Sequence, residues 1–137
     1  MIVVDSNVLA YHWLPGPRNA DAEALVRYDA EWAAPVLWRS EFRNVLTGYI
    51  RAGHLTQTDA ENAMHNAASC LLGGEHFVTD HAVFSLVAHS KCTAYDCEFV
   101  ALAQALSTVV ITEDRALLSS FPKYCYSLVD AVHGNIP

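Results

Sequence analysis

Short apolar segments rich in β-branched residues alternate along this chain with longer segments in which apolar residues recur at helical spacing. The strand-like segments are residues 2–4, 32–34, 76–78, 108–112 and 124–128. No hairpin-type turn joins any two of them, and parallel neighbours in a sheet need a crossover connection, usually a helix. The alternation therefore predicts a parallel sheet that is covered by helices on both faces.

The segments between the strands have the length and periodicity of helices. They cover residues 8–13, 19–30, 36–52, 58–72, 80–90, 95–107 and 115–119. Gly53 and the pair Gly73 and Gly74 follow two of these segments and are expected helix stops. The chain has 137 residues with no internal repeat and no linker-like stretch. We therefore expect one domain over residues 1–137, a three-layer α/β/α sandwich around a central, mainly parallel five-stranded sheet.

Charged residues are few, and acids outnumber bases. The chain holds 15 Asp and Glu against 8 Lys and Arg, a formal net charge of −7. This balance argues against a protein that holds nucleic acid mainly by broad electrostatic attraction. The longest apolar run, residues 33–38, is too short for a membrane span, and the chain start lacks a basic signal-peptide region. Four cysteines without a C-x-x-C pair are expected as free thiols in a reducing cytoplasm.

Two acids follow predicted strands at once. Asp5 comes directly after residues 2–4, and Asp114 follows residues 109–112 by one residue. In open parallel sheets ligands bind outside the carboxyl ends of the strands, so both acids are candidates for a site there. The alternative, which the sequence leaves open, is that each carboxylate simply caps the helix that follows.

Glu41 lies within a predicted helix, on a stripe with two apolar residues. Leu37 and Val45 are one turn away on either side, which places the carboxylate on or beside an apolar face. A buried charge needs a cation, a hydrogen-bond network or a raised pKa. An ion pair with Arg39 or Arg43 is the alternative, although neither arginine has the i±3 or i±4 spacing that favours a local pair.

Asp96 opens the predicted helix 95–107, and the pattern Thr93-x-x-Asp96 has the outline of a capping box. Alone it would be interpreted as a cap. Together with Asp5, Glu41 and Asp114 it supplies the hard oxygen ligands that Mg²⁺ and Mn²⁺ prefer. Four crowded carboxylates repel one another until a divalent ion neutralises them, and such an ion can activate water for in-line displacement at a phosphate. The set therefore predicts phosphodiester hydrolysis.

Four segments carry a family resemblance: MIVVDSNVLAYH, WRSEFRNVL, YDCEFVALAQAL and VITEDRALL. In order and spacing they resemble the four acidic motifs of PIN domains, particularly the VapC-like toxins, over residues 2–118. The resemblance implies a five-stranded parallel sheet flanked by helices and Mg²⁺- or Mn²⁺-dependent cleavage of single-stranded RNA. The positions that match the metal-binding, catalytic acids of the family are Asp5, Glu41, Asp96 and Asp114.

Other expectations come from the same resemblance. Thr112 matches a supporting hydroxyl position, while Ser6 and Asn7 stand where the family often has small polar residues beside the first acid. Turning the chain into the first helix is an equally valid role for that pair. The family also implies a possible antitoxin partner and a homodimer. Basic residues are scarce in this chain, and the candidates for RNA contact near the acids are Arg39, Arg43 and Arg115.

Three alternatives to an RNA-cleaving enzyme remain at this stage. A receiver-type signalling domain is also a small α/β/α sandwich, and Asp80, after residues 76–78, would be its phosphoacceptor. A PIN fold can act chiefly as a binding or regulatory protein with little RNA cleavage, although such a protein need not keep four repelling acids. A flap-type nuclease for structured DNA would need extra helices and more basic surface than this chain has.

Overall fold

The computed structural model describes all of residues 1–137 and contains the predicted five-stranded sheet. The strands are β1 (Ile2–Val4), β2 (Trp32–Pro35), β3 (Glu75–His76), β4 (Val110–Ile111) and β5 (Cys125–Tyr126). Every neighbouring pair is parallel, and the order across the sheet is β3-β2-β1-β4-β5. The expectation of a central parallel sheet is confirmed.

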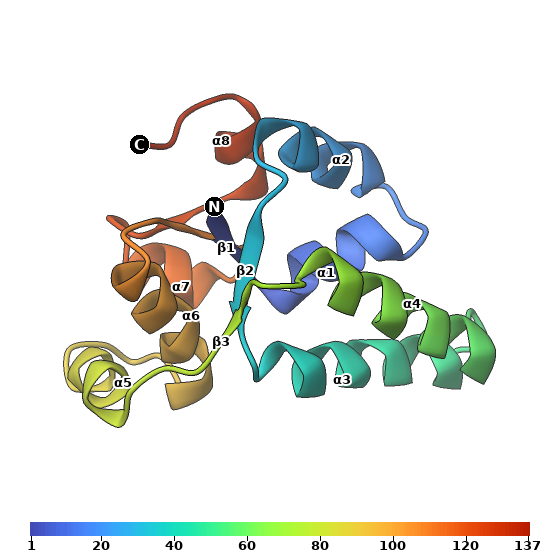
Figure 1. The fold of residues 1–137 in the computed structure, drawn as a ribbon, viewed down its shortest axis with the longest axis horizontal. Coiled ribbons are helices and arrows are strands. Elements are labelled where there is room, and N and C mark those ends of the chain that lie inside the picture. The colour runs from blue at the N-terminus through green and yellow to red at the C-terminus, as the bar shows by residue number, and fades with distance from the viewer.

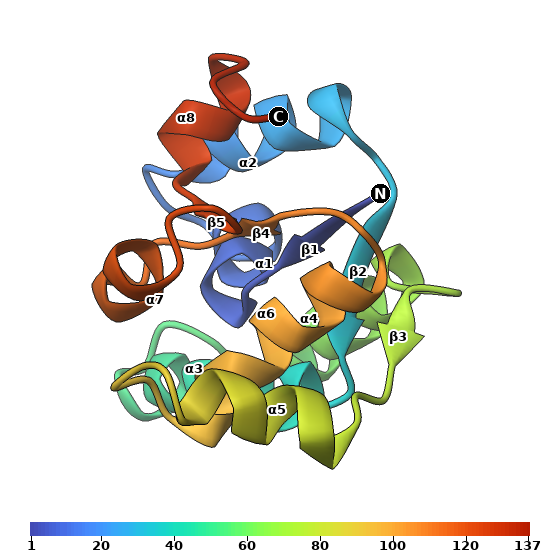
Figure 2. The same ribbon diagram turned by 90° about the vertical axis from the view of Figure 1, so that its left-hand side faces the viewer.

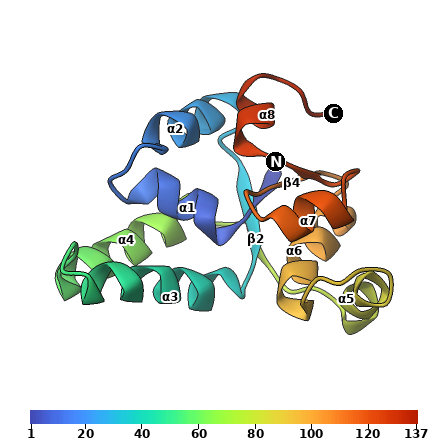
Figure 3. The same ribbon diagram turned by 180° about the vertical axis from the view of Figure 1, so that it is seen from behind.

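Eight helices cover the sheet. They are α1 (Ser6–Trp13), α2 (Asn19–Tyr28), α3 (Trp38–Arg51), α4 (Gln57–Cys70), α5 (Asp80–Val87), α6 (Ala94–Ala105), α7 (Arg115–Ser120) and α8 (Leu128–Val132). Helices α1 to α4 lie on one side of the sheet and α5 to α7 on the other (Figure 1), as the view from behind also shows (Figure 3). The short α8 packs against α2 at one end of the first layer (Figure 2). The three-layer α/β/α sandwich is therefore confirmed.

Each face of the sheet has its own apolar core. Side chains alternate between the faces of a strand, so Ile2 and Val4 of β1 belong to one cluster of 19 buried residues and Val3 to another cluster of 15. The first cluster lies under α1 to α4, and the second lies under α5 and α6. The middle of helix α6 is buried because the sheet covers one side of it and α5 packs on another. Its first turn, which carries Asp96, emerges from this core toward the surface.

The strand order determines where a ligand site is expected. Connections run one way from β1 through β2 to β3 and then the other way to β4 and β5, so the order reverses between β1 and β4. Ligands of open α/β sheets bind at that reversal, outside the carboxyl ends of the strands. A receiver-type sheet has the order 2-1-3-4-5, which this sheet does not share. The receiver alternative, with Asp80 as phosphoacceptor, is therefore wrong; Asp80 is an exposed residue at the start of α5.

Some boundaries differ from those expected. The fifth strand ends at Tyr126, because the hydroxyl of Ser127 accepts a hydrogen bond from the Asp130 backbone N–H at 3.1 Å and starts α8, which the sequence did not predict. The fourth strand is also shorter than expected. Its ladder nevertheless continues one step, since the Thr112 N–H donates to the Tyr126 carbonyl at 3.0 Å.

Glycines end two helices as expected. Gly53 and Gly73 follow α3 and α4 with φ angles of +78° and +79°, a region that L side chains rarely adopt. Gly74 has a different role: a Cβ there would collide with the carbonyl oxygen of Trp32. Only glycine allows β3 to approach β2 this closely.

Two compositional expectations can be compared with the structure. All four cysteines, Cys70, Cys92, Cys97 and Cys125, are free thiols, as expected. None of the helices combines the length and the apolar composition required to cross a membrane.

Candidate active site

Asp5 lies at the carboxyl end of β1, at the reversal of strand order. Its backbone N–H donates to the Ile111 carbonyl at 3.1 Å, so the β1–β4 ladder fixes its position. The residue is 8% exposed. Its Oδ1 accepts from the Ser6 N–H at 2.7 Å and its Oδ2 from the Thr112 hydroxyl at 2.7 Å. Asp5 is thus the N-cap of α1, as the capping interpretation predicted, and also a carboxylate whose two oxygens are held in fixed positions.

Thr112 connects Asp5 to Asp114. Its side chain is fully buried, and its hydroxyl donates to Asp5 while it accepts from the Asp114 N–H at 3.0 Å. Asp114 itself caps α7, its Oδ1 accepting from the Leu117 N–H at 2.9 Å. One hydroxyl therefore sets the spacing of two acids that end neighbouring strands.

Glu41 enters the same region from the first layer of helices, in the first turn of α3. Its Oε1 accepts from the Ser6 hydroxyl at 2.9 Å. The ion-pair alternative is excluded, because Arg39 instead pairs with Glu75, with Nη2 2.6 Å from Oε1. Arg43 forms no ion pair with Glu41 either. The half-buried Glu41 carboxylate therefore has a hydrogen-bond donor but no cationic side chain as a partner.

Asp96 makes only half of the capping box that its sequence pattern outlines. The Thr93 hydroxyl accepts from the Asp96 N–H at 3.1 Å, which caps α6. In the complete box at the start of α4, the Asp59 carboxylate also accepts from the Thr56 N–H at 3.0 Å. The Asp96 carboxylate has no such return bond to the Thr93 backbone. Capping the helix therefore does not account for this carboxylate.

All four predicted acids line one hollow of about 220 Å³. Asp5 and Asp114 come from strand ends, Glu41 from α3 and Asp96 from α6. The other lining residues are Ser6, Asn7, Asn44 and Val45. Asn44 is a lining residue that sequence reasoning missed, although its i+3 spacing from Glu41 puts it on the same helix face.

The electrostatics of the hollow are those of a crowded set of acids. Burial raises the pKa of Glu41 to about 7, and the charges of Asp5, Asp96 and Glu98 add to the rise. Burial likewise raises the pKa of Asp5, with contributions from Asp96 and Asp114. The pKa of Asp96 is raised by burial and then by Asp114. No Lys or Arg lines the hollow, and none of the four acids forms an ion pair.

Comparison with known proteins identifies the family. A model of the PIN domain matches residues 2–124. The chain belongs to the PIN domain family. This PIN domain is 28% identical over 124 residues to Ribonuclease VapC3 of Pyrobaculum aerophilum, a match that covers 88% of this chain and 95% of that protein. The sequence resemblance to VapC-like PIN domains is confirmed.

Two solved structures share the fold of this PIN domain. PAE2754 from Pyrobaculum aerophilum superposes with a TM-score of 0.75 at 18% identity, covering 97% of this chain and 87% of that one. FitAcB from Neisseria gonorrhoeae has a TM-score of 0.68 at 16% identity, with 94% and 99% covered. At these identities the likeness establishes the fold alone.

The acid hollow of the PIN domain fits a hydrated divalent cation better than a metal held only by side chains. No three or more His, Cys, Asp or Glu side chains in the structure are grouped closely enough to hold a metal ion. Zinc sites use three or four protein ligands, so this arrangement does not fit zinc. Mg²⁺ keeps several waters and uses one or two carboxylates, which matches acids that share a hollow without closing on one point. The four carboxylates have no cationic partner in the chain. A divalent cation would supply the missing positive charge.

None of the three arginines predicted to contact RNA lines the acid hollow of the PIN domain. Arg39 is engaged with Glu75, and its guanidinium lies over the Trp38 ring at 5.2 Å from the centroid. Arg43 lines a separate apolar hollow between α3 and α4. Arg115 is exposed at the start of α7. RNA contact by these residues stays a prediction.

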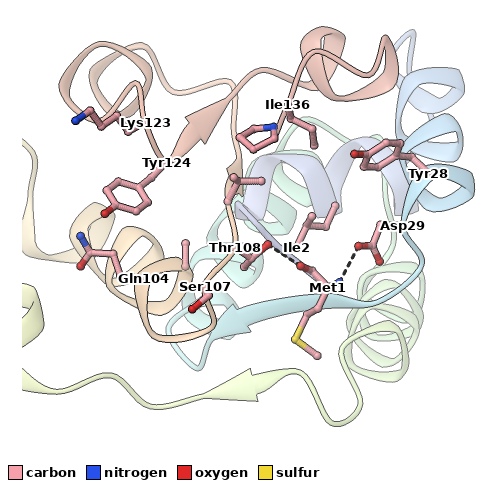
Figure 4. Close-up of a pocket in the computed structure, with 13 residues that line it drawn as sticks. Met1, Ile2, Tyr28, Asp29, Gln104, Ser107, Thr108, Lys123, Tyr124 and Ile136 are labelled. Atoms are coloured by element: carbon pink, nitrogen blue, oxygen red, sulfur yellow. Dashed lines mark hydrogen bonds and ion pairs between the residues drawn. The ribbon is translucent and has the colours of Figure 1, made fainter.

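A larger hollow of about 720 Å³ lies at the opposite end of the sheet in this PIN domain, where the strands begin (Figure 4). The one side-chain carboxylate in its wall, Asp29, has a cationic partner. The Met1 ammonium lies 2.8 Å from the Asp29 carboxylate, and the Thr108 hydroxyl donates to the Met1 carbonyl at 2.7 Å. Tyr28, Lys123 and Tyr124 also line it (Figure 4).

Proposed function

We propose that this PIN domain is a Mg²⁺- or Mn²⁺-dependent endoribonuclease that cleaves single-stranded RNA and serves as the toxin of a toxin–antitoxin pair. The observation that carries the proposal is the acid hollow: four carboxylates at the strand-order reversal, with no basic side chain among them. Similarity to Ribonuclease VapC3 supports the reaction class. The resemblance to VapC-like toxins extends the proposal to an antitoxin partner and a homodimer.

In the proposed reaction the residues of the acid hollow have different roles. A divalent ion, when bound, supplies activation of water and stabilisation of charge on the phosphate. Asp5 and Asp114 are kept at a fixed spacing by Thr112, so they would hold an ion as preorganised ligands rather than as mobile side chains. Ser6 fixes Glu41 through a hydrogen bond of 2.9 Å.

Glu41 also couples metal binding to the release of a proton in this proposal. Burial and neighbouring acids raise its pKa to about 7 in the metal-free chain, so part of the population carries a proton at neutral pH before a cation binds. Its Oε1 is occupied by Ser6, which leaves Oε2 as the atom that takes up or releases the proton. Relief of repulsion by a bound cation would lower this pKa, because the neighbouring acids contribute to the rise.

The scarcity of basic residues explains why the cation is central to substrate binding in this proposal. With no Lys or Arg lining the hollow, a phosphate approaching the metal-free site meets only negative charge. A divalent ion held by these acids would reverse the sign of the local field. Substrate binding should therefore depend on the divalent metal as strongly as cleavage does.

A PIN fold that mainly binds a partner and cleaves little RNA is the second candidate function. Its support is the weak basic character of the chain, with 8 Lys and Arg against 15 Asp and Glu. The persistence of four mutually repelling acids speaks against it, because a binding-only protein gains nothing from their cost.

The test is degradation of a fluorescent single-stranded RNA by the purified protein with Mn²⁺, with Mg²⁺ or with EDTA. The Asp5→Asn variant is measured beside it, and Asp29→Asn, at the other end of the sheet, is the matched control. We expect metal-dependent cleavage by the parent and Asp29→Asn proteins and none by Asp5→Asn. Equal cleavage by Asp5→Asn in a nuclease-free preparation contradicts the proposed site, and no cleavage by the parent on any RNA favours the binding-only function.

A further inference from the structure

A second, shallower hollow adjoins the acid hollow and is not used by the chemistry described so far. It has a volume of about 240 Å³. Its lining residues are Leu37, Ser40, Glu41, Asn44 and Tyr95. Glu41 and Asn44 line both hollows, so a ligand bound at the acids reaches the second hollow without leaving the surface.

Tyr95 is unusual in its surroundings. It precedes Asp96 directly in the first turn of α6, a helix most of whose later residues are buried. Its side chain is nevertheless 63% exposed. An aromatic ring so exposed gains little from packing, and here it forms one wall of a hollow that adjoins the candidate active site.

The charge of the hollow selects the part of an RNA that can enter it. No Lys or Arg lines it, and the one charged residue in its wall is the acid Glu41. A phosphate would be repelled here, whereas a neutral, planar base would not. Tyr95 and the half-buried Leu37 offer aromatic and apolar surface, and aromatic side chains bind bases of single-stranded nucleic acid by stacking.

Two polar side chains complete the hollow. Ser40 and Asn44 are both exposed on α3, four residues and therefore about one turn apart. An amide carries both a donor and an acceptor, so Asn44 can pair with the edge of a base, and a hydroxyl can do either. The volume lies below the about 300–1,000 Å³ of pockets that take drug-sized ligands. It suits a single base.

From these observations we propose that the hollow formed by Leu37, Ser40, Glu41, Asn44 and Tyr95 is a base-binding subsite. One base of the single-stranded RNA, next to the cleaved phosphodiester, stacks on Tyr95, and Asn44 reads its edge. This proposal rests on the ribonuclease function proposed above. It makes Tyr95 a determinant of affinity and Asn44 a determinant of sequence preference.

The first experiment measures KM and kcat for metal-dependent cleavage by the parent, Tyr95→Ala and Tyr95→Phe proteins. Loss of one base–aromatic stack should raise KM about 5- to 100-fold in Tyr95→Ala with little change in kcat. Tyr95→Phe keeps the ring and should keep the parent KM. Tyr28→Ala, which removes another exposed tyrosine at the far end of the sheet, is the matched control and should behave as the parent.

The same variants need a check that Asp96, the neighbour of Tyr95, is undisturbed. The Mn²⁺ concentration that gives half-maximal cleavage should be the same in Tyr95→Ala as in the parent. A raised Mn²⁺ requirement together with an unchanged KM at saturating Mn²⁺ would mean that Tyr95 only positions Asp96, and would overturn the subsite.

The second experiment removes the base instead of the tyrosine. Single abasic residues are scanned along a short RNA on either side of the cut. At one position the parent should lose affinity to the same degree as Tyr95→Ala, and Tyr95→Ala should lose nothing further there. Independent, additive losses at every position contradict stacking on Tyr95.

The third experiment tests the polar wall with RNAs that vary the base at that position. Asn44→Ala should cleave them with smaller differences in kcat/KM than the parent does, while Tyr28→Ala keeps the parent preference. An unchanged base preference in Asn44→Ala would contradict a role for Asn44 in base recognition.

The outcomes separate the two proposals. If the parent cleaves RNA and Tyr95→Ala has the parent KM, the subsite is wrong and the ribonuclease function stands. If the parent cleaves no RNA with any metal, the ribonuclease function is wrong and the subsite falls with it.

Discussion

The two ends of the parallel sheet hold hollows of opposite character. At the amino ends of the strands the hollow is about 720 Å³, its carboxylate Asp29 is paired with the Met1 ammonium at 2.8 Å, and Lys123 adds a second cation. At the carboxyl ends the hollow is only about 220 Å³, and four carboxylates share it without a cationic partner. The smaller hollow is the candidate active site. Unpaired charge at a strand-order reversal identifies this site, whereas volume alone would have selected the other end.

The difference is also one of energetics. At the amino ends the Thr108 hydroxyl and the Met1–Asp29 pair are satisfied by contacts within the chain, so this end has no repulsion between carboxylates for a cation to relieve. At the carboxyl ends burial and repulsion raise the pKa values of Asp5, Glu41 and Asp96. The folded chain therefore carries a cost at this end that a bound divalent cation would relieve.

The largest expected effect is the loss of cleavage when an acid of the smaller hollow is neutralised. Asp5→Asn and Asp96→Asn should each lower kcat/KM for metal-dependent RNA cleavage at least about 100-fold, because metal-assisted charge stabilisation contributes several kcal/mol. Asp29→Asn, the equivalent change at the other end, should leave it within about twofold. Gel or fluorescence assays of the three variants measure this. A comparable loss of kcat/KM in Asp29→Asn would contradict the functional difference between the two ends of the sheet.

Two threonines that flank β4 on either side provide a sharper comparison. The Thr112 hydroxyl holds Asp5 and the Asp114 backbone, whereas the Thr108 hydroxyl donates to the Met1 carbonyl. Thr112→Val keeps the shape but removes the contact that orients the ligands, so we expect the Mn²⁺ requirement for cleavage to rise about 10- to 100-fold.

Thr108→Val should leave the Mn²⁺ requirement unchanged and cost at most about 1 kcal/mol of unfolding free energy, the value of one hydrogen bond. Titration of activity with Mn²⁺ and urea unfolding of both variants test the pair. An identical Mn²⁺ requirement in Thr112→Val would contradict a positioning role for its hydroxyl.

Removing the metal should destabilise the parent and leave the acid variant unaffected. At a Mn²⁺ concentration of about 100 times the dissociation constant, binding adds about 2.7 kcal/mol to the unfolding free energy. Thermal unfolding should therefore shift upward on adding Mn²⁺ and back on adding EDTA. The shift should be absent in Asp5→Asn and retained in Asp29→Asn. A shift of equal size in Asp5→Asn would place the bound metal elsewhere.

The smallest expected effect is on pH-dependent stability in EDTA. The pKa of Glu41 rises from 4.5 to about 7 on folding, so the unfolded chain releases this proton first. Stability is then fully present below pH of about 4.5 and is lost as the pH rises through about 7.

Glu41→Gln should remove that loss and be more stable than the parent at pH 8 by about 1–2 kcal/mol. This value follows from about 1.4 kcal/mol per pKa unit, reduced for solvent screening of a half-exposed group. Urea unfolding at pH 4.5, 6 and 8 measures it. A parent whose stability rises across this range, with Glu41→Gln parallel to it, would contradict the repulsion inferred at this end.

Much of this arrangement was predictable from local sequence. β1 begins and ends where its β-branched run does, and acids placed after two strands of a parallel sheet meet by the geometry of the sheet alone. The capping interpretation of Asp5 and Asp114 is confirmed, and their role in catalysis stays a prediction, which capping does not exclude because a cap occupies one carboxylate oxygen. The sequence posed the two roles as alternatives, whereas in the structure each acid caps a helix and also lines the acid hollow.

What the sequence missed depends on distant contacts. The partner of Arg39 is Glu75, which lies 36 residues away in β3. Helix α8 was missed because the apolar residues after β5 are compatible with either a strand or a helix. The hydrogen bond from the Asp130 N–H to the Ser127 hydroxyl is what starts the helix there. Asn44 carries no motif, and its importance appears only when α3 is placed beside the acids. The repulsion between Glu98 and Glu41 likewise requires α6 and α3, from opposite layers, to approach the same edge of the sheet.

The most direct test of the central claim locates the metal itself. Mn²⁺ is paramagnetic and broadens the NMR signals of nearby nuclei, so its titration into isotope-labelled protein shows which end of the sheet binds it. We expect the backbone amide signals of Ser6, Asp96 and Asp114 to disappear first and those of Asp29 and Thr108 to remain, with no selective broadening in Asp5→Asn. Broadening at the amino-end hollow, or none at either end, would contradict the assignment of the acid hollow as the metal-dependent active site.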